Sequence, residues 1–250
     1  MERGECVEYF WDSGFTVPDG VGFSLFGGGH LFWIALWLFL CGVLGYAYSK
    51  WSDGKRLLCR RILAILLLAD ELFKVISTVA TGRFQLDYLP LHLCSINIFL
   101  ILADAWRPSD SLREILYAVC LPGAFFALLF PGWSYLPLWN GLCIHSFTVH
   151  ILLFFYPFLL ICGGFRPKFS RCLKLLPLCL LVVAGVYCFN QVFGTNFMFL
   201  SYAGEGNPLS LFEAALGSPG YLAGIPILCA LCWLVLYGGR ALLDKVKKLV

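Results

Sequence analysis

Apolar stretches of about twenty residues recur along the whole chain, and no other feature of the sequence restricts the possible folds as strongly. A stretch such as "LFWIALWLFLCGVLGYAY" is long enough to cross the hydrocarbon layer of a membrane as a helix. Only 13% of the 250 residues are charged, about half the fraction that is usual in soluble domains. The sequence therefore predicts an all-α, polytopic membrane helix bundle, and not a soluble domain with a large core.

We predict that residues 1–250 form a single integral membrane domain with seven transmembrane helices. The third and fourth helices are short for a full crossing. Residues 1–27 contain Arg3 as their only basic residue, so they lack the basic start of a cleavable signal peptide. The predicted helices span residues 28–49, 60–79, 90–106, 113–130, 142–163, 173–192 and 219–238.

The basic residues are distributed unevenly between the segments that connect these helices. Fifteen of the eighteen follow the first, third, fifth or seventh helix, whereas Arg3 and Arg83 occupy the alternate segments and Lys74 lies within the second helix. Cytoplasmic loops are enriched in Lys and Arg. We therefore expect an external N-terminal segment, 1–27, an external loop, 193–218, and a basic cytoplasmic tail, 239–250. The tail is a solvated flank or, alternatively, an amphipathic helix on the inner leaflet.

All four histidines of the chain lie near the external ends of predicted helices, in three different helices. Polar residues inside a membrane are costly and usually line a cavity or pathway. The sequence thus predicts a polar pocket at the depth of the outer leaflet, although any one of these histidines can instead simply bond to a neighbouring helix. The residues expected in or near this layer are His30, His92, His145, His150, Asn97, Asn190 and Asn196.

The second predicted helix contains three charged residues, Asp70, Glu71 and Lys74, within its apolar stretch. Either acid is spaced to pair with Lys74 along one helix face. Pairing and burial would reduce the cost of placing charges inside the membrane. Two interpretations remain open, a structural ion pair that joins neighbouring helices, or an acid that orients a catalytic histidine.

Helical geometry restricts the chemistry near His92. Ser95, three residues on, can face His92, whereas Cys94 lies about 200° round the helix and cannot. His145 and His150 lie about 140° apart, and no metal-binding, nucleotide-binding or hydrolase motif is present. We therefore expect no metal and no cofactor. Nucleic acid is not an expected partner either, because the basic residues flank membrane helices.

Four segments together carry a family resemblance: "LPLHLCSINIFL", "GAFFALLFP", "IHSFTVHILLFFYPFLLICGG" and "GTNFMFL". From Phe23 onward the chain resembles the YwaF-type bacterial membrane proteins, which are related to the transmembrane protein 164 family. The resemblance implies a multi-pass protein of a bacterial plasma membrane. It also implies a relation to animal acyltransferases that move polyunsaturated acyl chains between phospholipids through a cysteine nucleophile and a histidine.

The family's motif fits this chain only in part. Its "PCH" stretch falls on Pro90, Leu91 and His92, and its second histidine falls on His150. Leu91 therefore occupies the position of the nucleophilic cysteine, and Cys94 is a different position. The thioester mechanism implied by the resemblance does not transfer to this sequence.

The leading functional hypothesis is an intramembrane enzyme that acts on phospholipid at the outer leaflet, by acyl transfer or ester hydrolysis. One of His92 and His150 would act as general base, and the other would stabilise the transition state or donate a proton. The nucleophile could be Ser95, Ser146, water or a lipid hydroxyl, and Asn97 or Asn190 could donate to an oxyanion. A lipid or small-solute transporter and a non-catalytic scaffold or sensor are the alternatives. Membrane lipids are the expected partners, and the sequence does not indicate an oligomeric state.

Overall fold

The computed structural model describes residues 8–204 and 207–249, and the regular structure within these ranges is entirely helical. This confirms the predicted all-α class. Seven long helical segments and several short turns follow one another. In chain order they are α2 (Gly28–Lys50), α3 (Asp53–Ala80), η1 (Leu86–Tyr88), α4 (Leu93–Trp106), α5 (Asp110–Ile115), η2 (Leu116–Cys120), α6 (Leu121–Leu129), α7 (Gly141–Cys162), α8 (Phe169–Phe193), η3 (Phe197–Phe199), α9 (Leu209–Leu216), η4 (Gly220–Ala223) and α10 (Gly224–Leu249).

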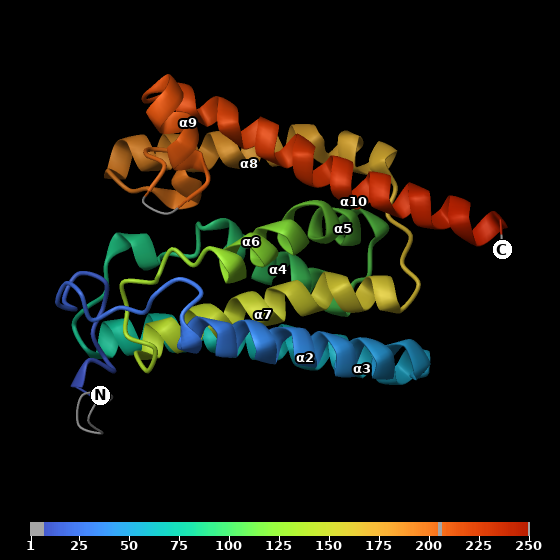
Figure 1. Cartoon of the computed structure of the whole chain (residues 1–250), viewed down its shortest axis with the longest axis horizontal. Helices are drawn as coiled ribbons and strands as arrows, with labels where there is room; N and C mark the ends of the chain where they lie inside the picture. The colour runs from blue at the N-terminus through green and yellow to red at the C-terminus, as the bar shows by residue number, and fades with distance from the viewer. Residues whose placement is uncertain (1–7, 205–206, 250) are drawn as a thin grey trace.

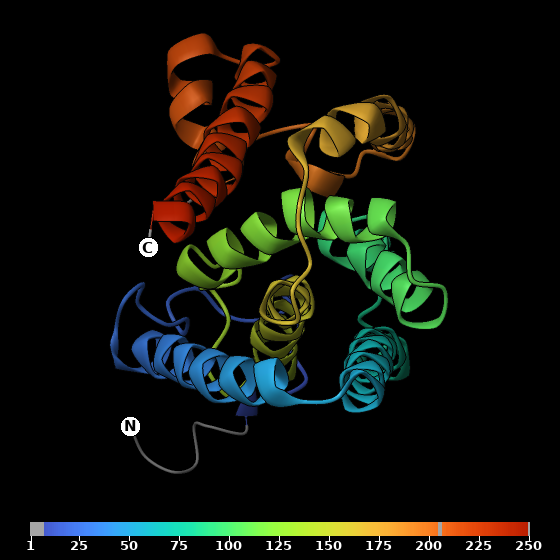
Figure 2. The same cartoon turned by 90° about the vertical axis from the view of Figure 1, so that its right-hand side faces the viewer.

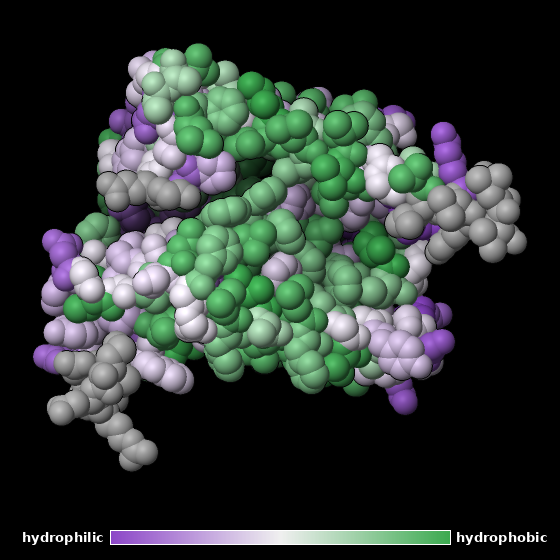
Figure 3. Space-filling model, viewed as in Figure 1, coloured by the Kyte–Doolittle hydropathy of each residue, from purple (hydrophilic) through white to green (hydrophobic). Residues whose placement is uncertain are grey.

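The long helices run up and down along one direction, and the start of α2 and the end of α10 lie at opposite ends of the molecule (Figure 1). The loops that precede α4, α7 and α10 lie at the same end as the start of α2, which we call the histidine end. The turns that follow α2, α4 and α7 lie at the other end, which we call the basic end. Figure 3 shows a broad apolar band between two more polar ends, as expected for a protein surrounded by lipid.

Helix α7 is the centre of the fold. It contacts α2, α3 and α6, and Figure 2 shows it enclosed by the other helices of the bundle. Asn140 caps the start of α7, because its Oδ1 accepts hydrogen bonds from the backbone N–H groups of Leu142 and Cys143 at 2.9 and 3.1 Å. Side chains of α7 itself, such as Phe147 and Tyr156, are fully buried in the main core. Side chains on α7 are therefore fixed from several directions.

Helices α8, α9 and α10 form a separate layer on one side of this bundle (Figures 1 and 2). The layer meets the bundle at η2, where one π-helical turn interrupts the helix formed by α5 and α6. Such a turn frees backbone groups for other partners. Trp233 of α10 donates to the carbonyl oxygen of Ala118 at 3.0 Å, and the Tyr117 hydroxyl donates to the carbonyl oxygen of Leu236 at 2.9 Å. Two hydrogen bonds thus join α10 to the π turn.

Six of the described helical segments are long and apolar enough to cross a membrane. The second predicted span, 60–79, is not among these six, but it is helical and forms most of the 28-residue α3. This helix differs from the other six because Asp70, Glu71 and Lys74 lie inside its apolar stretch.

Several predicted boundaries differ from those of the structure, and α3 begins at Asp53 and not at residue 60. The third predicted helix was expected to start at residue 90, but α4 begins at Leu93, after the 3-10 turn η1. The seventh was expected to end at residue 238, but α10 continues to Leu249 without a break and so includes most of the predicted tail. Residues 1–7 of the predicted N-terminal segment, and Val250 of the tail, lie outside the described residues.

Candidate functional site

A buried ion pair on α3 is hydrogen-bonded to α4. Lys74 Nζ lies 2.6 Å from Glu71 Oε1, and the same oxygen accepts a hydrogen bond from Ser95 Oγ at 3.0 Å. The spacing of the two charged residues on one helix predicts this pair. Ser95, which helical geometry had placed beside His92, instead contacts Glu71. The Glu71–Lys74 pair thus matches the structural interpretation of these charges.

The neighbouring acid, Asp70, is bonded to α7. Its Oδ1 lies 3.0 Å from Nδ1 of His145, and its Oδ2 accepts a hydrogen bond from Thr148 Oγ1 at 2.8 Å. A carboxylate in this position fixes the orientation of an imidazole ring and determines which ring nitrogen carries the proton. An acid of α3 is thus paired with a histidine, His145, and a catalytic role for that histidine stays a prediction. Thr148, which the sequence analysis did not select, completes the contact.

His30 is fully enclosed by the fold. Its Nδ1 accepts a hydrogen bond from the backbone N–H of Phe26 at 2.9 Å, so its Nε2 donates to the carbonyl oxygen of Leu128 at 2.8 Å. The ring also lies against Phe23 and Phe147. Both ring nitrogens are occupied, so His30 holds the start of α2 to the end of α6 and has no nitrogen left for a ligand.

Among the described residues, His150 is hydrogen-bonded through one ring nitrogen only. Its Nδ1 lies 2.6 Å from the carbonyl oxygen of Ser146, one turn earlier in α7, so this nitrogen must carry the proton. In the neutral ring the lone pair is then on Nε2. The ring is parallel to the indole of Trp133, with centroids 4.9 Å apart and an angle of 18° between the planes. His150 is thus held in one orientation as a proton acceptor.

His92 differs from the other three histidines. It is the N-cap of α4, with an extended backbone, and neither of its ring nitrogens hydrogen-bonds to any of the described residues. His92 lies within electrostatic range of Lys74 and Glu71, and His150 lies within electrostatic range of His92, Asp70 and His145. The structure therefore brings His92, His145 and His150 into one polar layer with the charged residues of α3. Within this layer, only the His92 ring is uncommitted.

The loop after α8 packs directly on His92. The ring of Phe197, which is fully buried, meets the imidazole edge-on with centroids 4.9 Å apart. Asn190 holds this phenylalanine, because its side chain accepts from the backbone N–H of Phe197 at 3.0 Å and donates to its carbonyl oxygen at 2.9 Å. Met198 and Phe199 follow with φ angles of 57° and 56°, which non-glycine residues rarely adopt. Such strain persists only where surrounding contacts enforce it, and it is concentrated at functional sites.

The three amides predicted for the layer have mainly structural contacts. Asn196 bonds to the backbone of Ser201 and Tyr202, as Asn190 does to Phe197. Asn97 donates through Nδ2 to the carbonyl oxygen of Leu93 at 2.8 Å, and its Oδ1 is buried without a partner among the described residues. An unpaired oxygen is an acceptor, so it does not suit the expected role as an oxyanion donor.

An unpaired donor lies elsewhere, on Trp133. Its Nε1–H is buried and has no hydrogen-bond partner among the described residues, and its indole stacks on His150. Buried polar groups without a partner are rare and call for an explanation. The sequence analysis missed this residue because a tryptophan in a loop between two membrane helices resembles an ordinary interfacial anchor.

Leu91 and Cys94 pack in different apolar clusters. Leu91 packs with Val186 and Phe197 in a small apolar cluster beneath the α8–α10 layer, whereas Cys94 packs against the main core of the bundle. The two residues therefore lie on different sides of the start of α4. None of the described residues form a group of three or more His, Cys, Asp or Glu side chains that could hold a metal ion.

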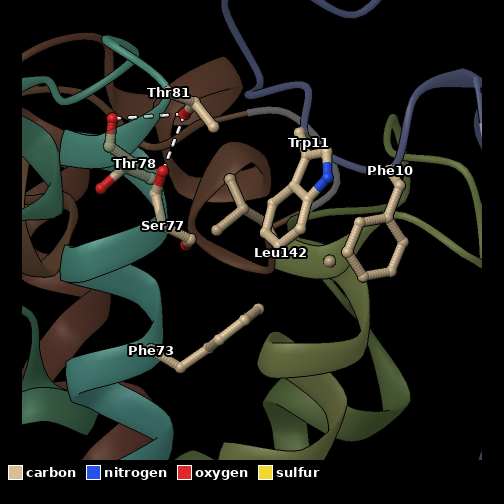
Figure 4. A pocket seen from close by; sticks show the side chains of 8 residues that line it. Phe10, Trp11, Phe73, Ser77, Thr78, Thr81 and Leu142 are labelled. Carbon is tan, nitrogen blue, oxygen red and sulfur yellow. Dashed lines mark hydrogen bonds between the residues drawn. The ribbon is translucent and has the colours of Figure 1, made fainter.

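A small cavity at the histidine end lies between the N-terminal segment, α3 and α7 (Figure 4). Phe10, Trp11 and Phe73 form its apolar side, and Ser77 and Thr81 lie on its α3 side. The Thr81 hydroxyl is bonded to the carbonyl oxygens of Ser77 and Thr78. The cavity holds about 10 Å³, which is room for about one water molecule and too little for a lipid headgroup.

Comparison with known families adds to this geometry. The profile of the TMEM164 family matches residues 25–237. The chain belongs to the TMEM164 family. The match begins just before α2 and ends within α10, so it includes every residue of the polar layer described above. Comparisons with curated proteins and with solved structures find no match.

Proposed function

We propose that this protein is an intramembrane enzyme that transfers or hydrolyses a phospholipid acyl ester at the outer leaflet, with His92 and His150 as its catalytic residues. The observation that carries the proposal is the contrast among the histidines. Both ring nitrogens of His30 are occupied by structural contacts, and Asp70 holds Nδ1 of His145. His150 retains a lone pair on Nε2, and among the described residues His92 has no hydrogen-bond partner for either ring nitrogen. Uncommitted imidazoles inside a membrane are costly, so a functional role explains their presence.

The fixed tautomer of His150 suggests its role. Nε2 would take the proton from water or a lipid hydroxyl while that oxygen forms a bond to the ester carbonyl carbon. The same nitrogen would return the proton to the leaving oxygen as the old C–O bond breaks. An N–H of His92, and the indole N–H of Trp133, would donate hydrogen bonds to the negative oxygen of the intermediate. This scheme needs no cysteine, which suits the leucine at position 91.

The substrate assignment rests on depth and access. A lipid ester lies just below the membrane surface, where the polar layer is expected. Helices α8 and α10 have few buried side chains, and the space-filling view is indented between their layer and the bundle toward the histidine end (Figure 3). An acyl chain entering sideways between these two layers would bring its ester toward His92.

The topology and location belong to the same proposal. The chain would cross a bacterial plasma membrane seven times as a single membrane domain of the YwaF type, with the N-terminus outside and the C-terminus in the cytoplasm. Helix α3 would cross the membrane in addition to the six more apolar helices, because Glu71 and Lys74 neutralise each other and Asp70 is bonded to α7. Alternation of the basic loops supports this orientation.

The test is an acyl-exchange assay in proteoliposomes that contain a labelled phospholipid and a lysophospholipid. The wild-type protein is expected to release labelled fatty acid or to transfer it to the lysophospholipid. His92→Ala and His150→Ala should each lose this activity while remaining folded. Cys94→Ala is the matched control, since it lies close in sequence but packs into the main core, and it should stay near wild-type activity.

Inactivity of the wild-type protein with every phospholipid class would refute the enzyme proposal. The transporter alternative is supported by the charged residues of α3, whose buried pairs with His145 and Ser95 resemble a proton-relay path. Transport would appear in the same vesicles as protein-dependent movement of a fluorescent lipid, or of protons, without any change in acyl composition.

A further inference from the structure

A second polar site lies at the basic end, opposite the histidine layer. A cavity of about 530 Å³ opens there between the end of α2, the start of α3, the start of α5 and the α7–α8 connection. This volume lies within the range of cavities that bind small molecules. Six cationic residues line it, and they come from three separate parts of the chain: Arg56, Arg60, Arg113, Arg166, Lys168 and Arg171.

Two of these cations are fixed in place by the surrounding structure. Arg171 donates through Nη1 to Glu114 Oε2 and through Nη2 to Asp110 Oδ2, both at 2.9 Å. The guanidinium of Arg56 donates to the carbonyl oxygens of Tyr48 and Ser49 at 3.0 and 2.8 Å. These contacts make a rigid wall, so the cavity is not simply a gap between mobile side chains.

Three other cations keep unused hydrogen-bond donors within the described part of the chain. Arg113 bonds to the buried Asp104 through Nε alone, which leaves its two Nη groups without a partner. The Nε of Arg60 is buried and makes no hydrogen bond. The ammonium group of Lys168 makes no ion pair. These donors come from α3, α5 and the α7–α8 connection, and they border one space.

The charges around the cavity do not balance. Asp53 and Asp110 line it, and the buried Asp104 and Glu114 contact its arginines from below. Arg166 apart, five cations face these four carboxylates, so the described lining is net positive. A phosphate monoester carries nearly two negative charges at neutral pH, and its oxygens match the fork of a guanidinium.

We propose that this cavity binds a phosphate group, either in the headgroup of an inner-leaflet lipid or in a small soluble phosphate compound. Basic pockets between helices on the cytoplasmic side of membrane proteins suit anionic headgroups. Basic residues that only flank a membrane helix have a different position. Lys55 and Lys174 lie at the same end of the molecule, but both are exposed and neither borders the cavity.

Binding can be measured on the purified full-length protein in an uncharged detergent, by native mass spectrometry and by thermal shift. The probes are dioctanoyl phosphatidic acid, glycerol 3-phosphate and, as the neutral comparison, dioctanoyl phosphatidylcholine. Saturable binding of phosphatidic acid alone assigns the site to a lipid, and binding of glycerol 3-phosphate assigns it to a soluble ligand. Failure of both to bind better than phosphatidylcholine overturns the proposal.

Variants test the location. Arg60→Gln and Lys168→Gln should each weaken phosphate binding by about tenfold or more, because each removes a charged donor. Lys55→Gln and Lys174→Gln remove the same charge outside the cavity and should bind as the wild type does. Equal losses in all four variants would mean unspecific attraction and would refute the site. Lys168 is exposed, so its variant should fold even if the Arg60 variant does not. His92→Ala should bind normally, which separates this site from the outer reaction.

Discussion

The imidazole of His150 lies parallel to the indole of Trp133, with 4.9 Å between the ring centroids. This contact connects a helix in the centre of the bundle to the loop between α6 and α7. It fixes the plane of a ring whose tautomer is already determined by the carbonyl oxygen of Ser146. The stacked pair thus presents a lone pair and an unpaired N–H donor from neighbouring rings.

Trp133→Phe is expected to keep an aromatic ring against His150 but to remove the N–H. If that donor stabilises a negative oxygen, acyl-transfer activity should fall by about a hundredfold, with stability nearly unchanged. The matched control is Trp37→Phe, because Trp37 also has a buried, unpaired Nε1 but packs in the apolar core against Phe154. Rates measured in proteoliposomes check this, and equal rates for both variants would exclude Trp133 from the chemistry.

His30→Ala should destabilise the protein much more than His92→Ala does. Loss of the His30 ring leaves the N–H of Phe26 and the carbonyl oxygen of Leu128 unpaired, which should cost about 2–4 kcal/mol. The His92 ring makes no hydrogen bond with a described residue, so its removal should cost far less. Thermal unfolding in detergent compares the two variants. A His92 variant as unstable as the His30 variant would indicate a structural role for His92.

Asn190→Ala should release the loop that holds Phe197 against His92. The side chain makes three buried hydrogen bonds, two to Phe197 and one with Thr195, and its loss should cost about 2–3 kcal/mol. Limited proteolysis should then cut between residues 194 and 204 faster than in the wild type. Asn196→Ala is a useful comparison, because it loosens the same loop at a position that bonds to Tyr202 and not to Phe197.

Lys74→Met should destabilise the protein by about 3–5 kcal/mol, because it leaves the carboxylate of Glu71 buried without its cation. The double variant Glu71→Gln with Lys74→Met removes both charges and should recover much of the loss. Chemical unfolding followed by tryptophan fluorescence measures both. If the double variant is no more stable than the single one, the two residues do not act as a pair.

The proposed topology predicts which side of the membrane each loop faces. Single cysteines at Lys55 and Phe169, in a variant without the other cysteines, should be protected from an impermeant maleimide in intact cells. A cysteine at Asp19 should react, because the segment before α2 is placed outside and this residue is exposed. Labelling at Lys55 or Phe169 before the cells are broken would reverse the orientation.

The apolar runs were sufficient to predict the helical class, and each of the seven predicted stretches contains a helix in the structure. The boundary at α4 could not be predicted, because "LPLHL" is as apolar as the helix that follows it. The proline at position 90 disfavours a helical conformation for the residue before it. His92 is the N-cap of α4 and has an extended backbone. The helical angles that place Ser95 and Cys94 relative to His92 in the sequence analysis therefore do not apply.

The four histidines looked equivalent in the sequence because each lies at a helix end of the same depth. What distinguishes them is their partners, and some of these lie far away in the chain, such as Leu128 for His30 and Asp70 for His145. The pairing of Glu71 with Lys74 was predictable, since both lie on one helix. The partner of Asp70 was not, because the contact with His145 depends on how α3 packs on α7.

The π turn at Leu116–Cys120 has a consequence for the sequence itself. A π turn is equivalent to one residue inserted into an α-helix, so everything after it is rotated by about 100° from the direction that an unbroken helix would give. Ala124 and Leu128 face the core only because of this rotation. A single-residue deletion within the turn would restore a regular helix, turn these side chains toward lipid and remove the carbonyl group that holds Trp233. In an alignment of relatives, a gap of one residue at this position would therefore identify proteins in which α10 is joined to the bundle by other contacts.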